Sequence, residues 1–448
     1  MALILNLIIF LTISSTYVVF SGTIHPENTK NKDKIVACYI GSWSVYRPLR
    51  GSFQIENIDP NLCTHLIYSF AGLDVATNSI KSLDPWQDLA DNYGKDGFGR
   101  IIKIKQTHPH IKVSLAIGGW NEGSENYSKL ANSTSRRSSF VSSAVSFLKK
   151  YNFDGLDLDW EFPTQRGGIP EDKQNFVSLV KELHTAFQKY NLLLTAAFNP
   201  NPKTVDQAYD VRGVSKYLDY LHIMNYDYHG LWDGKTGPNA PLYSDDDLNV
   251  EYSIKYFLKL GAPREKVVLG LAFYGRTFNL DTPNIESLGT PSTTGFQGPF
   301  TRENGFMGYN EICLELQNNT EKWTIHWDKL SATPFAVHET KLIAYDNPKS
   351  IAEKVRVALK YRLAGVMIWS IDTDDFHGDC KNEEVATLEK GFPMLRTVNI
   401  VLAESPPAED SNEIPTDVDT KTDDGNNGSI LKINLVLLLS TIIISFHH

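Results

Sequence analysis

Short apolar segments, rich in β-branched and aromatic residues, recur along the chain between stretches whose apolar positions follow the helical period of about 3.6 residues. The predicted strands are residues 35–43, 65–73, 112–119, 155–161, 192–198, 220–227, 267–275 and 365–373. Strands that alternate with amphipathic helices predict parallel pairing through right-handed crossovers. Eight such units close a (β/α)8 TIM barrel, an α/β fold whose sites lie at the carboxyl ends of the strands. An open doubly wound sheet is the alternative, but no glycine-rich phosphate loop follows the first strand.

One connection is too long for a helix and two loops. About ninety residues separate the seventh predicted strand from the eighth, where roughly thirty would be enough. Residues 277–342 are rich in glycine, threonine, asparagine and aromatic residues. We therefore expect a small α+β insertion domain between strands seven and eight, within a barrel that covers residues 34–396.

The amino-terminal segment resembles a targeting signal rather than a part of the folded domain. Residues 1–22 contain an apolar run followed by small residues, which predicts a secretory signal peptide, although a basic n-region is missing. A buried strand or a membrane anchor is the alternative. The Asn-X-Ser/Thr motifs at Asn126, Asn132, Asn318 and Asn427 agree with secretion, and the first three are predicted glycosylation sites.

The carboxyl-terminal segment is acidic and then apolar. Residues 397–429 include eight acidic residues and one basic residue between Glu404 and Asp424, which predicts a disordered stalk. Residues 430–448 form a hydrophobic tail whose apolar run, 435–446, is twelve residues long. That is fewer than the roughly twenty residues that span a bilayer. Small residues, a spacer and a terminal apolar tail match a GPI-attachment signal, and a short tail anchor or a frayed hydrophobic end is the alternative. The predicted location is secreted or on the extracellular cell surface.

The amino-acid composition is that of a globular protein and excludes several other classes. The chain is 42% hydrophobic and 21% charged, with 30 glycines and 21 prolines, which excludes collagen, a coiled coil and wholesale disorder. The net charge is -10 and no basic run of the kind that binds phosphates occurs, so we expect no nucleic-acid partner. No zinc-ligand spacing occurs, so we expect no metal and no cofactor.

Four cysteines lie in the predicted barrel region, and a secreted context favours their pairing. Cys38 lies on the first predicted strand and Cys63 directly before the second, so these two are expected to pair. Cys313, in the insertion, would then pair with Cys380 beyond strand eight. Free buried thiols are the alternative.

The fourth predicted strand carries acidic side chains at alternate positions. Because side chains alternate in a strand, Asp157, Asp159 and Glu161 share one face, and the apolar residues between them share the other. In a barrel the apolar face packs on the helices, which directs the acids inward. A buried row of like charges is costly and raises the pKa of at least one carboxyl, which can then donate a proton. Glu161 is the predicted general acid, with Asp159 beside it. The alternative is a structural hydrogen-bond cluster.

Several motifs accompany this row of acids, each at the end of a predicted strand. They are Asp154-x-x-Asp157-x-Asp159-x-Glu161, Ser114–Asn121 with its Gly118-Gly-Trp120, Met224–Asp227 followed by His229 and Trp232, Tyr274–Arg276, and Met367–Ser370 before Asp374. With these motifs in this order, the chain resembles the family 18 glycoside hydrolases, the chitinases, and in particular the animal and arthropod enzymes with an α+β insertion.

The resemblance implies a substrate-assisted reaction with retention. Glu161 would protonate the glycosidic oxygen, and the substrate's own N-acetyl carbonyl would attack the anomeric carbon. Asp159, with Asp157 below it, would hydrogen-bond the acetamido N–H, and Tyr226 would hold the acetamido oxygen in line. These four residues are the predicted catalytic group.

The resemblance also implies a sugar-binding set along the cleft. Its members are Tyr39, Trp43, Phe70, Gly118, Trp120, Asn121, Met224, Asp227, Trp232, Tyr274, Arg276, Met367 and Trp369. The predicted function is that of a monomeric endo-chitinase that hydrolyses β-1,4-linked N-acetylglucosamine polymers. The alternatives are a non-catalytic chitin-binding lectin and a growth-factor-like relative, in which the acid at position 161 would be replaced. Here it is glutamate.

Overall fold

The computed structural model describes residues 34–317, 322–381 and 391–404. The predicted signal peptide, the GPI signal, most of the predicted stalk, Asn318 and Asn427 lie outside the described residues. Within them, no helix is long and apolar enough to cross a membrane.

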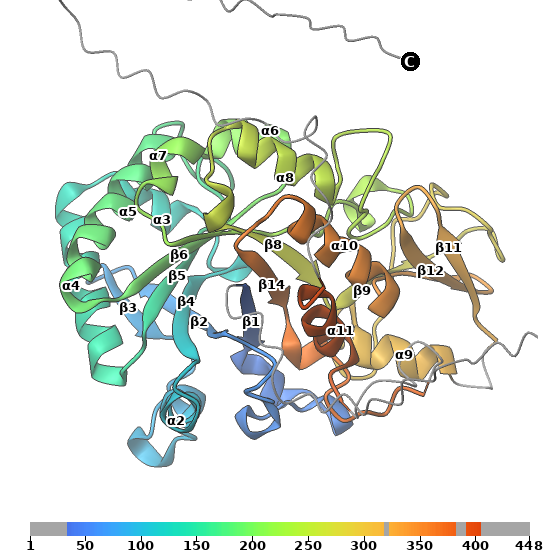
Figure 1. The fold of residues 1–448 in the computed structure, drawn as a ribbon, viewed down its shortest axis with the longest axis horizontal. Coiled ribbons are helices and arrows are strands. Elements are labelled where there is room, and N and C mark those ends of the chain that lie inside the picture. The colour runs from blue at the N-terminus through green and yellow to red at the C-terminus, as the bar shows by residue number, and fades with distance from the viewer. Residues whose placement is uncertain (1–33, 318–321, 382–390, 405–448) are drawn as a thin grey trace, which may run out of the picture.

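Parallel strands close into a barrel (Figure 1). They are β1 (Ile35–Gly41), β2 (His65–Asp74), β4 (Lys112–Gly118), β5 (Gly155–Asp159), β6 (Leu193–Phe198), β7 (Tyr220–Ile223), β8 (Val267–Ala272) and β14 (Gly365–Trp369). Strand β1 pairs with both β2 and β14, which closes the ring. The predicted barrel is confirmed, and the open doubly wound sheet is excluded.

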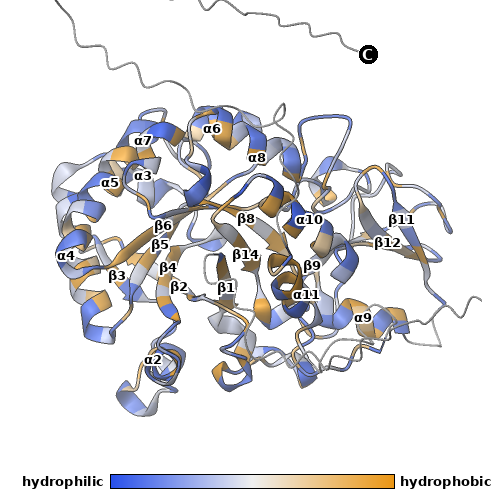
Figure 2. Cartoon of the chain, in the orientation of Figure 1, coloured by the Kyte–Doolittle hydropathy of each residue, from blue (hydrophilic) through white to orange (hydrophobic). Residues whose placement is uncertain are grey.

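Helices cover the outside of the barrel. The longer ones are α2 (Gly97–Thr107), α4 (Thr134–Tyr151), α5 (Asp172–Phe187), α8 (Val250–Lys259), α10 (Pro348–Lys360) and α11 (Pro393–Leu402). The shorter ones are α1 (Pro85–Asp88), α3 (Glu125–Ala131), α6 (Pro202–Ala208), α7 (Val211–Ser215) and α9 (Tyr309–Gln317). Side-chain caps mark where several begin: Asn249 accepts from the Tyr252 amide at α8, and Asn347 from the Ser350 amide at α10. Figure 2 shows hydrophobic strands at the centre and hydrophilic positions on the outer helical faces.

Alternation along the strands produces two apolar layers. On β5, Leu156 and Leu158 face outward into the large core between barrel and helices, and Trp160, directly after the strand, packs there edge-on against Phe176 of α5. A smaller cluster, which includes Ala116, Val268 and Met367, fills the interior. The predicted division of β5 into an apolar outer face and an acidic inner face is therefore present.

A second, antiparallel sheet lies between β8 and β14 in the chain, at the right of Figure 1. Its strands are β9 (Tyr274–Asn279), β10 (Met307–Gly308), β11 (Thr324–Asp328), β12 (Thr333–His338) and β13 (Lys341–Ala344). The predicted strand over 267–275 was wrong at its end: β8 stops at Ala272, and Tyr274 begins β9 of the second sheet. A short strand that was not predicted, β3 (Ser79–Ser82), pairs antiparallel with β2.

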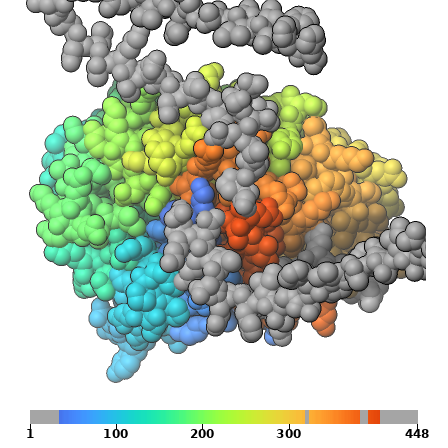
Figure 3. Space-filling view, viewed as in Figure 1, coloured from blue at the N-terminus to red at the C-terminus, as the bar shows by residue number. Residues whose placement is uncertain are grey.

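Helix α11 packs against α10, and Arg356 of α10 binds the Glu404 carboxylate that follows α11. Figure 3 shows α11, in red, at the surface near the middle of this face. The prediction that the stalk begins at residue 397 was wrong, because residues 397–402 continue α11 and Val398 and Val401 are buried. Apolar positions at helical spacing, rather than the acidic residues after them, decide the local structure here.

Both predicted disulfides are confirmed. Cys38 pairs with Cys63, and Cys313 pairs with Cys380. The described part of the chain contains no free cysteine, so the alternative of buried thiols was wrong.

Candidate active site

The acidic residues of β5 lead to the carboxyl end of the barrel. Asp157 and Asp159 lie on the strand, but the strand ends at Asp159, and Glu161 follows in a bend. The predicted strand over 155–161 was therefore two residues too long. The predicted ends at residues 43, 227 and 373 were also too late, because β1, β7 and β14 stop at Gly41, Ile223 and Trp369. At these points the chain leaves the barrel wall to form the loops that carry the site.

Hydrogen-bond donors surround the lower carboxylate, Asp157, which is fully buried. Its Oδ2 accepts from the Tyr39 hydroxyl at 2.8 Å, and its Oδ1 accepts from the Thr195 hydroxyl at 2.5 Å. The His222 Nδ1 atom lies 3.3 Å from the same Oδ1. Both oxygens of this buried carboxylate therefore have hydrogen-bond partners, which offset its loss of contact with water.

The next carboxylate, Asp159, has a different environment. It is buried, and its Oδ1 atom has no hydrogen-bond partner among the described residues. Burial, then the nearby charges of Glu161 and Asp157, raise the pKa of Asp159 well above its usual value. Asp159 is thus disposed to hold a proton and to offer an oxygen to a bound molecule.

Glycine at position 118 is required by the approach of two strands. Gly118 ends β4 with a φ of +112°, and a Cβ atom there would lie 2.1 Å from the Asp159 carbonyl oxygen. The next amide, that of Gly119, donates to this carbonyl oxygen at 2.8 Å. The glycine pair therefore holds the backbone beneath the Asp159 side chain.

Glu161 has the protonation behaviour of a general acid. Burial and the charge of Asp227 raise the pKa of Glu161 to about 7, and the charge of Arg166 opposes this rise. A carboxyl with a pKa near neutrality is protonated in weakly acidic solution and can still give up its proton.

Facing residues come from the loop after β7 and from β9. Tyr226 is buried, and its hydroxyl contacts the Met367 sulfur at 3.8 Å. Asp227 accepts from the Tyr274 hydroxyl at 2.7 Å and from Arg276 Nε at 2.9 Å. Met224, just before them, is half-buried. The second sheet thus contributes a wall to the site, through Tyr274 and Arg276.

Aromatic rings form the opposite side. The Trp369 ring lies 5.8 Å from that of Phe70, 5.7 Å from that of Tyr39 and 6.1 Å from that of Trp43, and Trp43 stacks on Phe70 at 6.0 Å. Trp43 is 42% exposed, whereas Tyr39 is buried with its hydroxyl on Asp157. The outer rings are therefore open to a ligand, and Tyr39 connects this aromatic layer to the acids.

Two further tryptophans are exposed, each with an arginine over its ring. The Arg166 guanidinium lies 3.6 Å from the centre of the Trp120 ring and donates to the Trp120 and Glu161 carbonyl oxygens. The Arg276 guanidinium lies 5.1 Å from the Trp232 ring. Asn121, next to Trp120, is also exposed. Flat apolar faces of this kind pack well against the C–H faces of sugars, and the arginines hold the rings in place.

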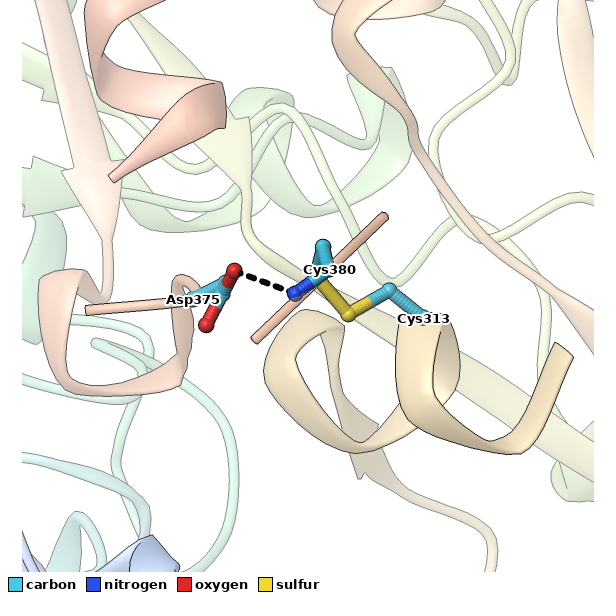
Figure 4. A group of neighbouring side chains, drawn as sticks. All are labelled: Cys313, Asp375 and Cys380. Carbon is cyan, nitrogen blue, oxygen red and sulfur yellow. Dashed lines mark hydrogen bonds between the residues drawn. A yellow bond between two sulfur atoms is a disulfide. The ribbon is translucent and has the colours of Figure 1, made fainter. Parts of the chain in front are cut away.

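One group of side chains outside the site has the composition of a metal centre: Cys313, Asp375 and Cys380 (Figure 4). Its two sulfurs are joined in a disulfide, and Asp375 accepts a hydrogen bond from the Cys380 amide at 2.8 Å. Thiolates, not disulfide sulfurs, bind metals, so this group is structural.

Three residues of the site were not predicted: Thr195, His222 and Arg166. Thr195 and His222 lie on inner faces of β6 and β7, and alternation along those strands could have indicated them once Leu221 and Ile223 were assigned outward. Arg166 lies in a loop, where no periodicity applies.

The comparisons with known proteins agree with this geometry. The family model "Glycosyl hydrolases family 18" matches residues 35–374. "Probable chitinase 2" of Drosophila melanogaster is 52% identical over 413 residues, covering 86% of this chain and 85% of that protein. "Endochitinase" of Manduca sexta is 37% identical, covering 85% of this chain and 70% of that protein. The crystal structure of the Ostrinia furnacalis Group IV chitinase, also solved in complex with allosamidin, is 41% identical with a TM-score of 0.78, covering 83% of this chain and 100% of that chain.

Proposed function

The chain belongs to the family 18 glycosyl hydrolases, and from this premise we propose that it is an endochitinase that hydrolyses β-1,4-linked N-acetylglucosamine polymers with retention. The observation that carries the proposal is Glu161. It is present at the carboxyl end of β5, and burial raises its pKa to about 7. A lectin or a growth-factor-like relative would have no use for a proton donor at this position.

The first step joins proton donation to attack by the substrate. Glu161 protonates the glycosidic oxygen, while the carbonyl oxygen of the substrate's N-acetyl group attacks the anomeric carbon. The bond to the leaving sugar breaks, and an oxazolinium ion forms. Asp159 accepts a hydrogen bond from the acetamido N–H and offsets the positive charge, and its unpartnered Oδ1 supports this role. The Tyr226 hydroxyl, whose contact with the Met367 sulfur is weak, holds the acetamido oxygen in line.

The second step returns the enzyme to its resting state. Glu161, now ionised, takes a proton from water, and the resulting attack opens the oxazolinium ring from the face that the leaving group occupied. The configuration at the anomeric carbon is therefore retained.

The aromatic residues provide the sugar-binding platforms. Trp369 forms the floor beside the cleaved bond, with Tyr39 and Phe70 next to it and Trp43 further toward the non-reducing end. Trp120 and Trp232 support the product side. The polar set across the cleft, Asp227 with Tyr274 and Arg276, hydrogen-bonds the sugar. The row of exposed rings supports a polymeric substrate.

We also propose that the protein is a secreted, glycosylated monomer held at the cell surface by a GPI anchor. The apolar segments at residues 1–22 and 430–448 support this location. Of the predicted glycosylation sites, Asn132 is exposed and Asn126 is half-buried. Ser128, the serine of the Asn126 motif, donates a hydrogen bond to Asp172. Release of chitinase activity from washed cells by a phosphatidylinositol-specific phospholipase tests the anchor.

The central experiment compares the full chain with the variant Glu161→Gln on soluble chito-oligosaccharides. We expect the variant to lower kcat by about 10²- to 10⁴-fold, because the amide cannot donate the proton, with oligosaccharide binding retained. The matched control is Glu125→Gln, which removes a surface carboxylate paired with Lys129. Binding without turnover in the wild type would favour the lectin.

A further inference from the structure

Beneath the carboxylates, a buried histidine faces the same interior space. His222 lies on β7 and is 1% exposed, while its neighbours Leu221 and Ile223 face the outer core. Its Nδ1 atom lies 2.7 Å from the Tyr39 hydroxyl oxygen and 3.3 Å from Asp157 Oδ1. The reaction described above does not use this residue.

The hydroxyl hydrogen of Tyr39 can serve only one of its two neighbours, so the hydrogen-bond donors among Tyr39, Asp157 and His222 can be assigned. The Tyr39 hydroxyl has one hydrogen, and its oxygen lies 2.8 Å from Asp157 Oδ2 and 2.7 Å from His222 Nδ1. An ionised carboxylate can only accept. With Asp157 ionised, Tyr39 must donate to Asp157, so the hydrogen between His222 and Tyr39 must belong to Nδ1. The opposite direction would require a protonated Asp157.

We propose that His222 is a positioning residue for the chitinase reaction, and that its Nδ1–H holds Tyr39 and Asp157 in place beneath Asp159. This inference rests on the proposed function. It adds a third strand, β7, to the support of the reacting carboxylates.

The other groups around the imidazole are consistent with this arrangement. Burial raises the pKa of Tyr39 well above its usual value, so the phenol remains a donor. Burial, and then the charge of His222, lower the pKa of His65 on β2 to about 4, so His65 is neutral at neutral pH. The residues in register with His222 are Ala197 on β6 and Val268 on β8, which do not titrate. Asp157 is the carboxylate that the ring contacts.

Two variants of the full chain test the proposal. His222→Leu fills a similar volume but removes the donor, whereas His222→Asn keeps an N–H near the position of Nδ1 and does not titrate. We expect His222→Leu to lower kcat by about 10- to 100-fold, with KM within about threefold of wild type. Because a donor beside the Asp157 carboxylate is lost, the acid limb of kcat against pH should move to higher pH. His222→Asn should restore most of kcat and of the acid limb.

The proposal is overturned if folded His222→Leu has the kcat and acid limb of the wild type, or if His222→Asn is no better than His222→Leu. Nitrogen-15 NMR of the ring in the wild type gives an independent answer, even where a variant does not fold: a protonated Nδ1 supports the proposal and a bare Nδ1 overturns it. A wild type that does not cleave chito-oligosaccharides refutes the proposed function instead, and is distinguished by the absence of turnover before any change at His222.

Discussion

The carboxyl groups at the two ends of β5 differ in their hydrogen-bond partners and in their pKa values. In the lower half, Asp154 accepts from Lys105 Nζ at 3.0 Å and from the Val113 amide at 2.8 Å, and Asp157 accepts from Tyr39 and Thr195. In the upper half, Asp159 has a buried oxygen with no partner among the described residues, and Glu161 has its pKa raised to about 7. Carboxyl groups are thus surrounded by hydrogen-bond donors at one end and prepared for proton transfer at the other.

The difference indicates which acids serve the fold and which serve the reaction. A buried carboxylate with donors on both oxygens gains back most of its lost hydration, whereas one without them destabilises the folded state. Burial of the two upper carboxyl groups destabilises the folded chain, so selection for folding alone would not keep them there. Their presence has to be explained by function. The predictions below test whether the two halves can be separated.

The largest expected effect is in the upper half. We expect Asp159→Asn to lower kcat by about 10²- to 10³-fold, because an amide cannot carry the charge that offsets the oxazolinium ion. Steady-state kinetics on soluble chito-oligosaccharides measure the effect, with Asp154→Asn as the matched change in the lower half. Equal losses in the two variants would contradict the separation.

The pH dependence of the reaction reports on Glu161. The general acid must be protonated, and burial raises the pKa of Glu161 from the usual value of a glutamate, about 4.5, to about 7. We therefore expect kcat/KM to fall about tenfold per pH unit above pH 7. Because this carboxyl has a higher pKa in the folded chain than in the unfolded chain, its contribution to stability is complete below about pH 4.5 and is lost as the pH rises through 7. Glu161→Gln should accordingly remove this loss, as seen in the melting temperature measured from pH 5 to pH 8. A basic limb well above pH 9 would argue against Glu161 as the proton donor.

The smallest effect on catalysis is expected in the lower half. Asp154→Ala removes the carboxylate partner of Lys105, which keeps its hydrogen bond to the Asn152 carbonyl, and leaves the Val113 amide without its acceptor. We expect the free energy of unfolding to fall by about 1–3 kcal/mol. We expect kcat to stay within about twofold of wild type, because Asp154 lies at the end of β5 away from the substrate. Urea unfolding and the chito-oligosaccharide assay give the two quantities. A large fall in kcat without loss of stability would show that the lower half also takes part in catalysis, and would contradict the separation.

Much of the barrel could be predicted from the sequence because its signals are local. Each strand is a short apolar run, and the acids on β5 alternate with leucine, which identifies the inner face before any partner is known. Strand ends were less predictable: Glu161 continues the alternation of β5 but lies beyond the strand, and Tyr274 continues the apolar run of β8 but belongs to another sheet. Alternation persists through a bend, so it does not show where backbone pairing stops.

The sequence by itself determined which face of β5 is acidic, that Glu161 is present, and that the motifs lie in order at strand ends. Only the tertiary structure decided how deeply each acid is buried and which donors surround it. The partners of Asp157 come from β1, β6 and β7, with Tyr39 lying 118 residues away in the chain. Asp159 differs because its Oδ1 has no such partner within residues 34–317, 322–381 and 391–404. Protonation depends on desolvation and on donors brought together by closure of the barrel, and neither is encoded in the spacing of residues along one strand.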